Sequence, residues 1–180
     1  LSTRKELRMA FLGTSWEYDC KSCSTAWKMS FAKEWHAQKK SRQLDVRHTF
    51  AAMTLYLEDK DAFFNHVIKQ VFPNQSIQKF TPTIKEAMTA LGFGAKLSMG
   101  TWRSDTGEEN QSSLFEVFDR DTVVLKRFVE CNLVKTFNAE QQTLSKYIVA
   151  KFSGDTVWQA EMAAEQQRKK VLQFSAAQKI

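Results

Sequence analysis

Apolar side chains recur three or four residues apart along most of this chain, and this spacing constrains the fold more than any other feature. Such a period places apolar residues on one face of an α-helix. Only 2 prolines interrupt the 180 residues, whereas Phe occurs 14 times. Because proline breaks helices and a β-sandwich needs many turns, the pattern predicts an all-α protein. From the same period we expect about seven helices in an irregular bundle.

Helix start signals locate most of these helices. Thr14 with Glu17, and Thr83 with Glu86, have the spacing of capping boxes, while Asp61 and Asp121 can act as N-caps. Gly92 is expected to end a helix in the left-handed conformation, after a connector at 73–80. One helix is expected from Thr14 to about Ser41. Two further helices are expected around the apolar stripes at 46–57 and 63–71. The remaining helices are expected to span about 84–91, 121–137, 139–152 and 155–178.

The segment after Gly92 has a different pattern. Apolar residues alternate with small or polar ones from Phe93 to Gly100, and the stretch from Gly92 to Gly100 contains three glycines. This period of two predicts a short β-hairpin or an extended loop near 93–118. Ser113 and Glu116 form a further capping box. We therefore favour a loop followed by a helix in this segment.

The length of the chain predicts a single helical domain over residues 1–180. Its last helix, 155–178, is expected to protrude, because residues 163–170 are polar on almost every side. No apolar run approaches the roughly 18 residues that a membrane span needs, so we expect no span. The 3 cysteines are an odd number, which favours a reducing, intracellular compartment over a disulfide framework. We expect this compartment to be the cytoplasm, or an organelle matrix if an upstream targeting segment was removed.

The sharpest local motif lies near the amino end. Cys20 and Cys23 form a CxxC pair, and His36 follows Cys23 after twelve intervening residues. Residues 18–36 thereby resemble the two-cysteine, two-histidine zinc finger, which implies a zinc site at Cys20, Cys23 and His36. Residues 40–42 lack the fourth ligand, so His48 would have to complete the tetrahedron. We favour a different interpretation, in which both thiols lie on the buried stripe of one continuous helix, together with the aromatic residues Trp16, Trp27, Phe31 and Trp35. A redox pair is the remaining alternative. No metal and no cofactor are therefore expected.

Basic residues gather toward the two ends of the chain. The net charge is +6, and residues 1–50 carry ten Lys and Arg against five Asp and Glu. A solvated surface accounts for such an excess, and so does contact with the phosphates of RNA or single-stranded DNA, independent of base sequence. The candidate nucleic-acid-binding residues are Lys33, Lys39, Lys40, Arg42, Arg47, Arg168, Lys169 and Lys170.

No motif for nucleophilic catalysis, phosphate binding or dinucleotide binding occurs in the chain. The 5 tryptophans and the many phenylalanines are residue types favoured in protein interfaces. The sequence therefore predicts a non-catalytic helical subunit of a larger macromolecular assembly, which acts through protein–protein contacts with other subunits. A nucleic-acid-binding protein is the alternative.

Overall fold

The computed structural model describes residues 23–38, 45–103, 107, 109–110, 112–157, 159–160 and 162–164. This part of the chain is all-α, as predicted, but it contains nine helices rather than about seven. The helices are α2 (Cys23–Ser30), α3 (Ala32–Gln38), α4 (Val46–Thr49), α5 (Ala51–Glu58), α6 (Lys60–Val71), α7 (Ile77–Gly92), α8 (Ser113–Val117), α9 (Thr122–Glu130) and α10 (Asn132–Phe152). None of them combines the length and the hydropathy that a membrane span requires.

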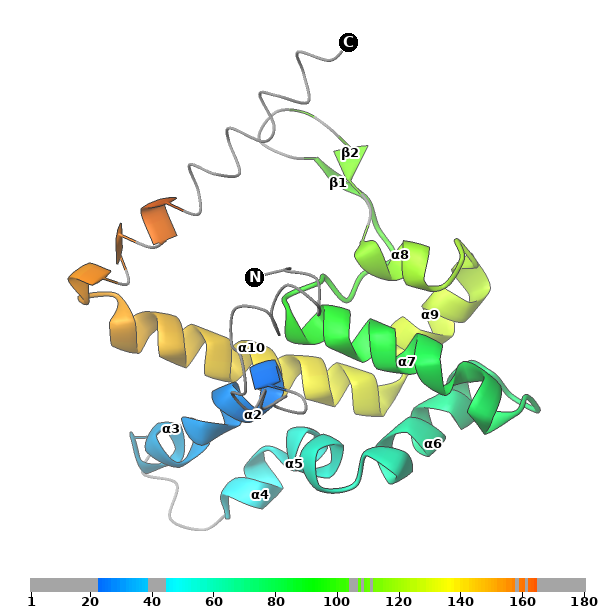
Figure 1. Ribbon diagram of the computed structural model, residues 1–180, viewed down its shortest axis with the longest axis horizontal. Coiled ribbons are helices and arrows are strands. Elements are labelled where there is room, and N and C mark those ends of the chain that lie inside the picture. The colour runs from blue at the N-terminus through cyan, green and yellow to red at the C-terminus, as the bar shows by residue number, and fades with distance from the viewer. Residues whose placement is uncertain are drawn as a thin grey trace, which may run out of the picture.

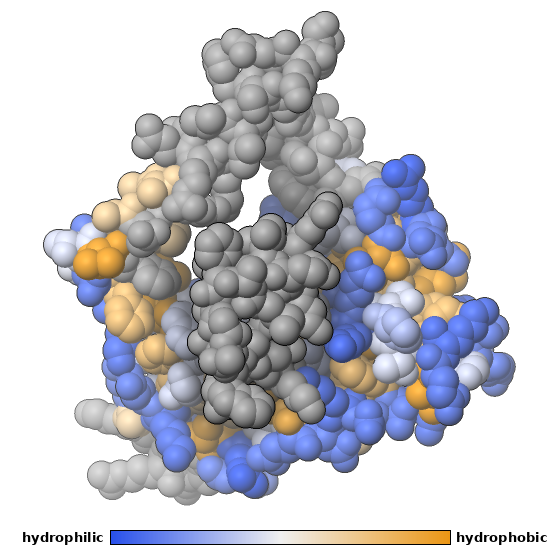
Figure 2. Space-filling model, viewed as in Figure 1, coloured by the Kyte–Doolittle hydropathy of each residue, from blue (hydrophilic) through white to orange (hydrophobic). Residues whose placement is uncertain are grey.

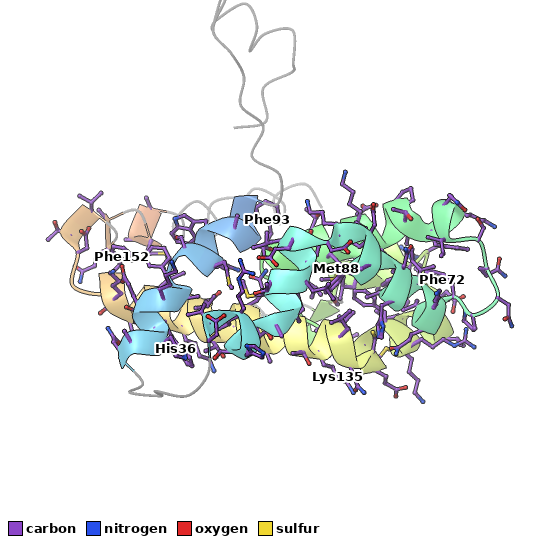
Figure 3. All side chains as sticks on the ribbon, turned by 90° about the horizontal axis from the view of Figure 1, so that it is seen from below. His36, Phe72, Met88, Phe93, Lys135 and Phe152 are labelled. Atoms are coloured by element: carbon purple, nitrogen blue, oxygen red, sulfur yellow. The ribbon has the colours of Figure 1, made fainter. Side chains whose placement is uncertain are left out.

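The long helix α10 organises the bundle. It packs against α5, α2 and α3 on one side of the molecule and against α9 on the other, while α6 packs on both α7 and α9. Figure 1 shows α2 lying across α10, with α6 to α9 gathered toward the amino end of α10. Seen from below, the described helices form a shallow layer rather than a tall bundle (Figure 3).

An aromatic cluster fills the centre of the core. Phe137 of α10 meets the ring of Tyr56 with centroids 5.0 Å apart and the ring of Phe63 at 5.7 Å, both in edge-to-face geometry. Tyr56 and Phe63 also meet each other at 5.3 Å. Phe63 and Phe137 are fully buried, and aromatic pairs in this geometry add to the free energy gained from burial. The cluster thus joins α5, α6 and α10.

The single helix predicted from Thr14 to Ser41 is wrong in its continuity. Residues 14–22 and 39–41 lie outside the described part, and between them α2 and α3 are separated at Phe31, whose amide donates to the carbonyl of Lys28. The predicted buried stripe is wrong in α2, where Trp27 is 46% exposed and Thr25 is buried instead. Farther along, Phe31 and Trp35 are half-buried, and Trp35 packs against the core. The face that α2 turns toward the core therefore carries Thr25 rather than Trp27. Thr25 can be buried on this face because Gln141 of α10 donates a hydrogen bond to it.

Other predicted helix limits shift for local reasons. The helix expected over 46–57 is divided at Phe50, and the cap of α6 is Asp59, whose carboxylate accepts from the amide of Ala62. Asp121 caps α9 as predicted, by accepting from the amides of Val123 and Val124. The boundary expected near residue 138 lies instead at Cys131, where the backbone is extended (φ −60°, ψ 118°). Hence α10 takes in the end of one predicted helix and all of the next.

Helix α7 is longer than predicted, because 77–80 belong to it rather than to a connector. Pro82 lies inside this helix, where it removes one backbone hydrogen bond. The ring of Phe80 stacks on Phe72 of the preceding turn at 3.8 Å, and this contact holds the first turns in place. The predicted left-handed conformation of Gly92 is wrong; the positive φ lies two residues later, at Gly94 (94°).

A short antiparallel pairing follows α7. Strand β1 (Trp102–Arg103) pairs with β2 (Glu109–Asn110), with Trp102 opposite Asn110. The favoured loop is therefore wrong at this pairing, where the structure has the short β-hairpin that was the alternative. The predicted helix after the segment is confirmed by α8, which the Ser112 side chain caps. After α10, the expected turn at Ser153–Gly154 is present. The described residues of 156–164 that follow are helical, and 165–178, the rest of the predicted protruding helix, lie outside the described part.

Candidate functional site

A polar cluster lies where α2 meets the carboxyl end of α7 and the middle of α10. Ser24 Oγ donates to the carbonyl of Gly92 over 2.7 Å, and Lys28 Nζ donates to the same carbonyl over 3.1 Å. Lys28 also donates to Gln141 Oε1 at 2.7 Å, and Gln141 Nε2 donates to Thr25 Oγ1 at 2.8 Å. These bonds satisfy the last carbonyl of α7 and the buried side chains of Thr25 and Gln141.

Burial lowers the pKa of Lys28 from its ordinary value. A buried lysine of lowered pKa is a feature of some catalytic sites. Here, however, the ammonium group has two acceptors at hydrogen-bond distance and no acidic partner among the hydrogen bonds of the described residues. We therefore interpret the cluster as a structural joint between α2, α7 and α10.

Glu140 is a buried acid next to this joint along α10. Its two carboxylate oxygens accept from the amides of Ala52 and Met53, at 3.2 and 2.8 Å. The residue before α5, Phe50, supplies no side-chain cap, so a carboxylate 87 residues away along the chain takes the place of one. Desolvation raises the pKa of Glu140, and the backbone amides of Met53 and Ala52 partly oppose that rise.

Two aromatic side chains beside the joint are left exposed. Phe93 follows the Gly92 carbonyl directly and is 81% exposed, while Trp27 precedes Lys28 and is 46% exposed. We call Phe93 and Trp27 the aromatic surface. In Figure 3, Phe93 lies on the opposite side of the layer from His36. The free energy of roughly 1.5–3 kcal/mol that burial of a phenylalanine side chain contributes is therefore not gained at Phe93 in the free chain.

A shallow pocket of about 360 Å³ lies between α3 and the carboxyl half of α10, lined by Trp35, Gln38, Thr143, Lys146 and Tyr147. Beside it, Tyr147 Oη donates to Glu34 Oε2 over 3.2 Å and accepts from Gln38 Nε2 over 3.2 Å. Glu34 also forms an ion pair with Lys151. The hydrogen bond from Lys151 lowers the pKa of Glu34, and the same bond raises the pKa of Lys151. Desolvation raises the pKa of Tyr147, and the hydrogen bond to Glu34 together with the negative charge of Glu34 raises it further.

Only two of the basic residues predicted to bind nucleic acid lie in the described part. Lys33 is exposed on α3, and Arg47 is exposed on α4, where it forms an ion pair with Glu58 at 3.3 Å. The others lie outside the described residues: Lys39, Lys40, Arg42, Arg168, Lys169 and Lys170. The structure therefore gives no relative placement for most of this set.

The candidate zinc ligands are likewise only partly placed. Cys20 lies outside the described residues, Cys23 is the first residue of α2, His36 lies half-buried on α3 and His48 is exposed on α4. Within the described ranges, no group of three or more His, Cys, Asp or Glu side chains could hold a metal ion.

Sequence reasoning missed the polar joint, Glu140 and the pocket. All three depend on contacts between segments far apart in the chain, such as Lys28 with Gln141, and no local spacing reports them. No family model, no curated protein and no solved structure matches this chain. Its function must be argued from its own residues.

Proposed function

We propose that this chain is a non-catalytic helical subunit of a larger macromolecular assembly and that it acts through protein–protein contacts. The observation that carries the proposal is the exposure of Phe93, the most exposed of the large apolar side chains in the described part, at 81%. Aromatic residues at the centre of an interface supply most of its binding energy when a partner excludes water from them.

The surroundings of Phe93 favour an interface over a chance exposure. A single exposed apolar residue is ordinary on a protein surface. Here Trp27 is exposed as well, and the Gly92 carbonyl beside Phe93 is bonded to Ser24 and Lys28 on either side of Trp27. The joint thus holds the backbones beneath both rings in place, so little freedom would be lost on binding. Apolar residues also reach the surface near the carboxyl end of α10, where Val149 is 51% exposed (Figure 2).

Phe93→Asp should abolish association with the partner subunit while leaving the fold intact. A carboxylate placed in a desolvated interface centre costs several kcal/mol, equivalent to a loss of affinity of roughly 100-fold or more. The Phe93 side chain makes little contact in the free chain, so its replacement should change the free energy of unfolding by less than about 0.5 kcal/mol. Affinity purification of tagged full-length chain from its native cells, followed by mass spectrometry, measures the association.

Val123→Asp is the matched control, because Val123 is 58% exposed on α9 and receives the same change. The control should retain the partners that Phe93→Asp loses. If both variants retained the same partners, or if the wild-type chain recovered as a monomer with none, the proposal would be wrong.

A nucleic-acid-binding protein is the alternative function. One observation favours it, namely the pocket in which Trp35 and Tyr147 lie beside Lys146, since nucleic-acid-binding surfaces combine aromatic rings with cations. The excess of basic residues over acidic ones in residues 1–50 supports the same alternative.

The alternative predicts that Lys39→Glu combined with Lys40→Glu weakens binding to a single-stranded oligonucleotide by roughly 10-fold or more at low salt. Both residues follow Gln38 of the pocket directly in the chain. Fluorescence anisotropy of a labelled oligonucleotide, titrated at several salt concentrations, measures the affinity. Unchanged affinity in the double variant would remove this alternative.

A further inference from the structure

The pocket between α3 and α10 has walls suited to a flat ring. Trp35 and Tyr147 supply two aromatic side chains, and Trp35 is supported from behind by an edge contact with the buried Phe50 at 5.3 Å. The volume of about 360 Å³ lies near the lower limit of small-molecule sites. The pocket is therefore large enough for one ring system with a substituent and too small for an extended cofactor.

The charge of the lining favours an anion. Lys146 is exposed and makes no ion pair with any residue that the structure describes. Glu34, an acid beside the pocket, is already paired with Lys151 and accepts a hydrogen bond from the hydroxyl of Tyr147. Because no carboxylate belongs to the lining itself, the ammonium group of Lys146 is available to an incoming negative group.

The polar groups of the lining can serve the edge of a heterocycle. Gln38 Nε2 donates one hydrogen bond to Tyr147, which leaves its second N–H and, among the hydrogen bonds of the described residues, the carbonyl oxygen of the same amide. Thr143 Oγ1 donates to the carbonyl of Ala139 and retains its capacity to accept. A donor and two acceptors thus border the aromatic walls.

We propose that this pocket binds a nucleotide, with the planar base against Trp35 and Tyr147 and the phosphate at Lys146. The same chemistry is offered by a free mononucleotide and by one nucleotide of a single strand, and the two sources are separated by experiment. The inference does not depend on the protein-contact proposal, whose residue Phe93 lies on the other side of the layer from α3 (Figure 3). It gives the nucleic-acid alternative a specific site.

The test uses the full chain and two probes at low salt. Adenosine monophosphate is titrated by calorimetry, and a fluorescein-labelled oligoadenylate of about ten nucleotides is titrated by anisotropy. Lys146→Glu should weaken the binding of whichever probe the protein binds by roughly 10-fold or more. For the oligonucleotide, it should also make the negative slope of log affinity against log salt less steep by about 0.7. Adenosine, which lacks the phosphate, should bind more weakly than the monophosphate.

Lys135→Glu is the matched control, because Lys135 is exposed on the same helix, outside the pocket, and receives the same change of charge (Figure 3). It should change affinity by less than about 2-fold if binding is local rather than a response to net charge. Trp35→Leu should weaken either probe by roughly 10-fold through loss of stacking. Circular dichroism identifies any Trp35 variant that fails to fold, and the exposed Lys146 variant then carries the test.

The outcomes divide cleanly. Binding of the monophosphate that Lys146→Glu weakens assigns a free nucleotide to the pocket. Binding of the oligonucleotide alone, weakened in the same way, assigns a single strand. Binding of neither probe at low salt overturns the inference, and so does an equal loss in the Lys135 and Lys146 variants.

Discussion

Phe137→Ala should lower the free energy of unfolding by about 3–5 kcal/mol, the largest effect of any substitution considered for this protein. Phe137 is fully buried and contacts the rings of Tyr56 and Phe63 edge-on. Its removal deletes apolar burial, leaves a cavity between α5, α6 and α10, and ends both aromatic contacts. Urea denaturation followed by circular dichroism at 222 nm measures the change.

Two further variants make this prediction specific. Phe137→Leu retains most of the volume and should cost less than the alanine substitution, roughly 1.5 kcal/mol. Lys135→Ala, two positions earlier on an exposed site of the same helix, should change stability by less than about 0.5 kcal/mol. A cost below about 1 kcal/mol for Phe137→Ala would mean that the core is not packed around this ring.

Glu140→Ala should destabilise the protein by about 2–4 kcal/mol, because it removes the acceptor of two buried amides and leaves a small cavity. The amides of Ala52 and Met53 would lose their partner at the start of α5, where no local side chain can replace it. Glu140→Gln keeps one amide oxygen as an acceptor and should cost less, about 1 kcal/mol at neutral pH. Urea denaturation of the three proteins at one pH measures this order.

The pH dependence of Glu140 has a definite sign. Its folded-state pKa is raised above the ordinary value of 4.5, mainly by desolvation. The folded state therefore holds the proton more tightly than the unfolded state does. The stabilisation that comes from this proton is fully present below pH 4.5 and is lost as the pH rises through the raised pKa. Above that pKa, Glu140 no longer makes the stability depend on pH.

Comparison with Glu140→Gln isolates this contribution, because the other carboxylates titrate alike in both proteins. The stability of the wild type relative to the Gln variant should fall as the pH rises from 4.5 toward neutrality. A relative stability that rises over the same interval would show that the amide bonds outweigh desolvation and that the pKa is lowered.

Where a helix depends on local signals, the sequence predicted it well. Asp121 caps α9 because its carboxylate lies within reach of amides only two and three residues ahead. Ser153 and Gly154 end α10 for equally local reasons. Predictions failed where a tertiary contact overrides local preference. Pro82 predicts a helix start, yet α7 begins earlier because Phe80 stacks on Phe72.

The candidate sites were less predictable than the helices. The tryptophan stripe of the amino-terminal segment was expected to face the core, since large apolar side chains usually do. Its burial is instead decided by Thr25 and Lys28, whose partners on α10 and α7 make a polar face acceptable inside. Thr143 and Lys146 of the pocket have no distinctive sequence pattern, because only the approach of α3 gives their position a meaning.

The joint at Gly92 also bears on how the protein is made. In the described part of the chain, the partners that hold α2 and α3 lie later in the sequence, among them Phe50, Gly92, Gln141 and Lys151. During translation these two helices leave the ribosome first, and although α4 and α5 soon follow, their packing is incomplete and their aromatic rings stay partly open to water or chaperones until α10 emerges. The first part of the described chain to be synthesised is therefore the last to find its place.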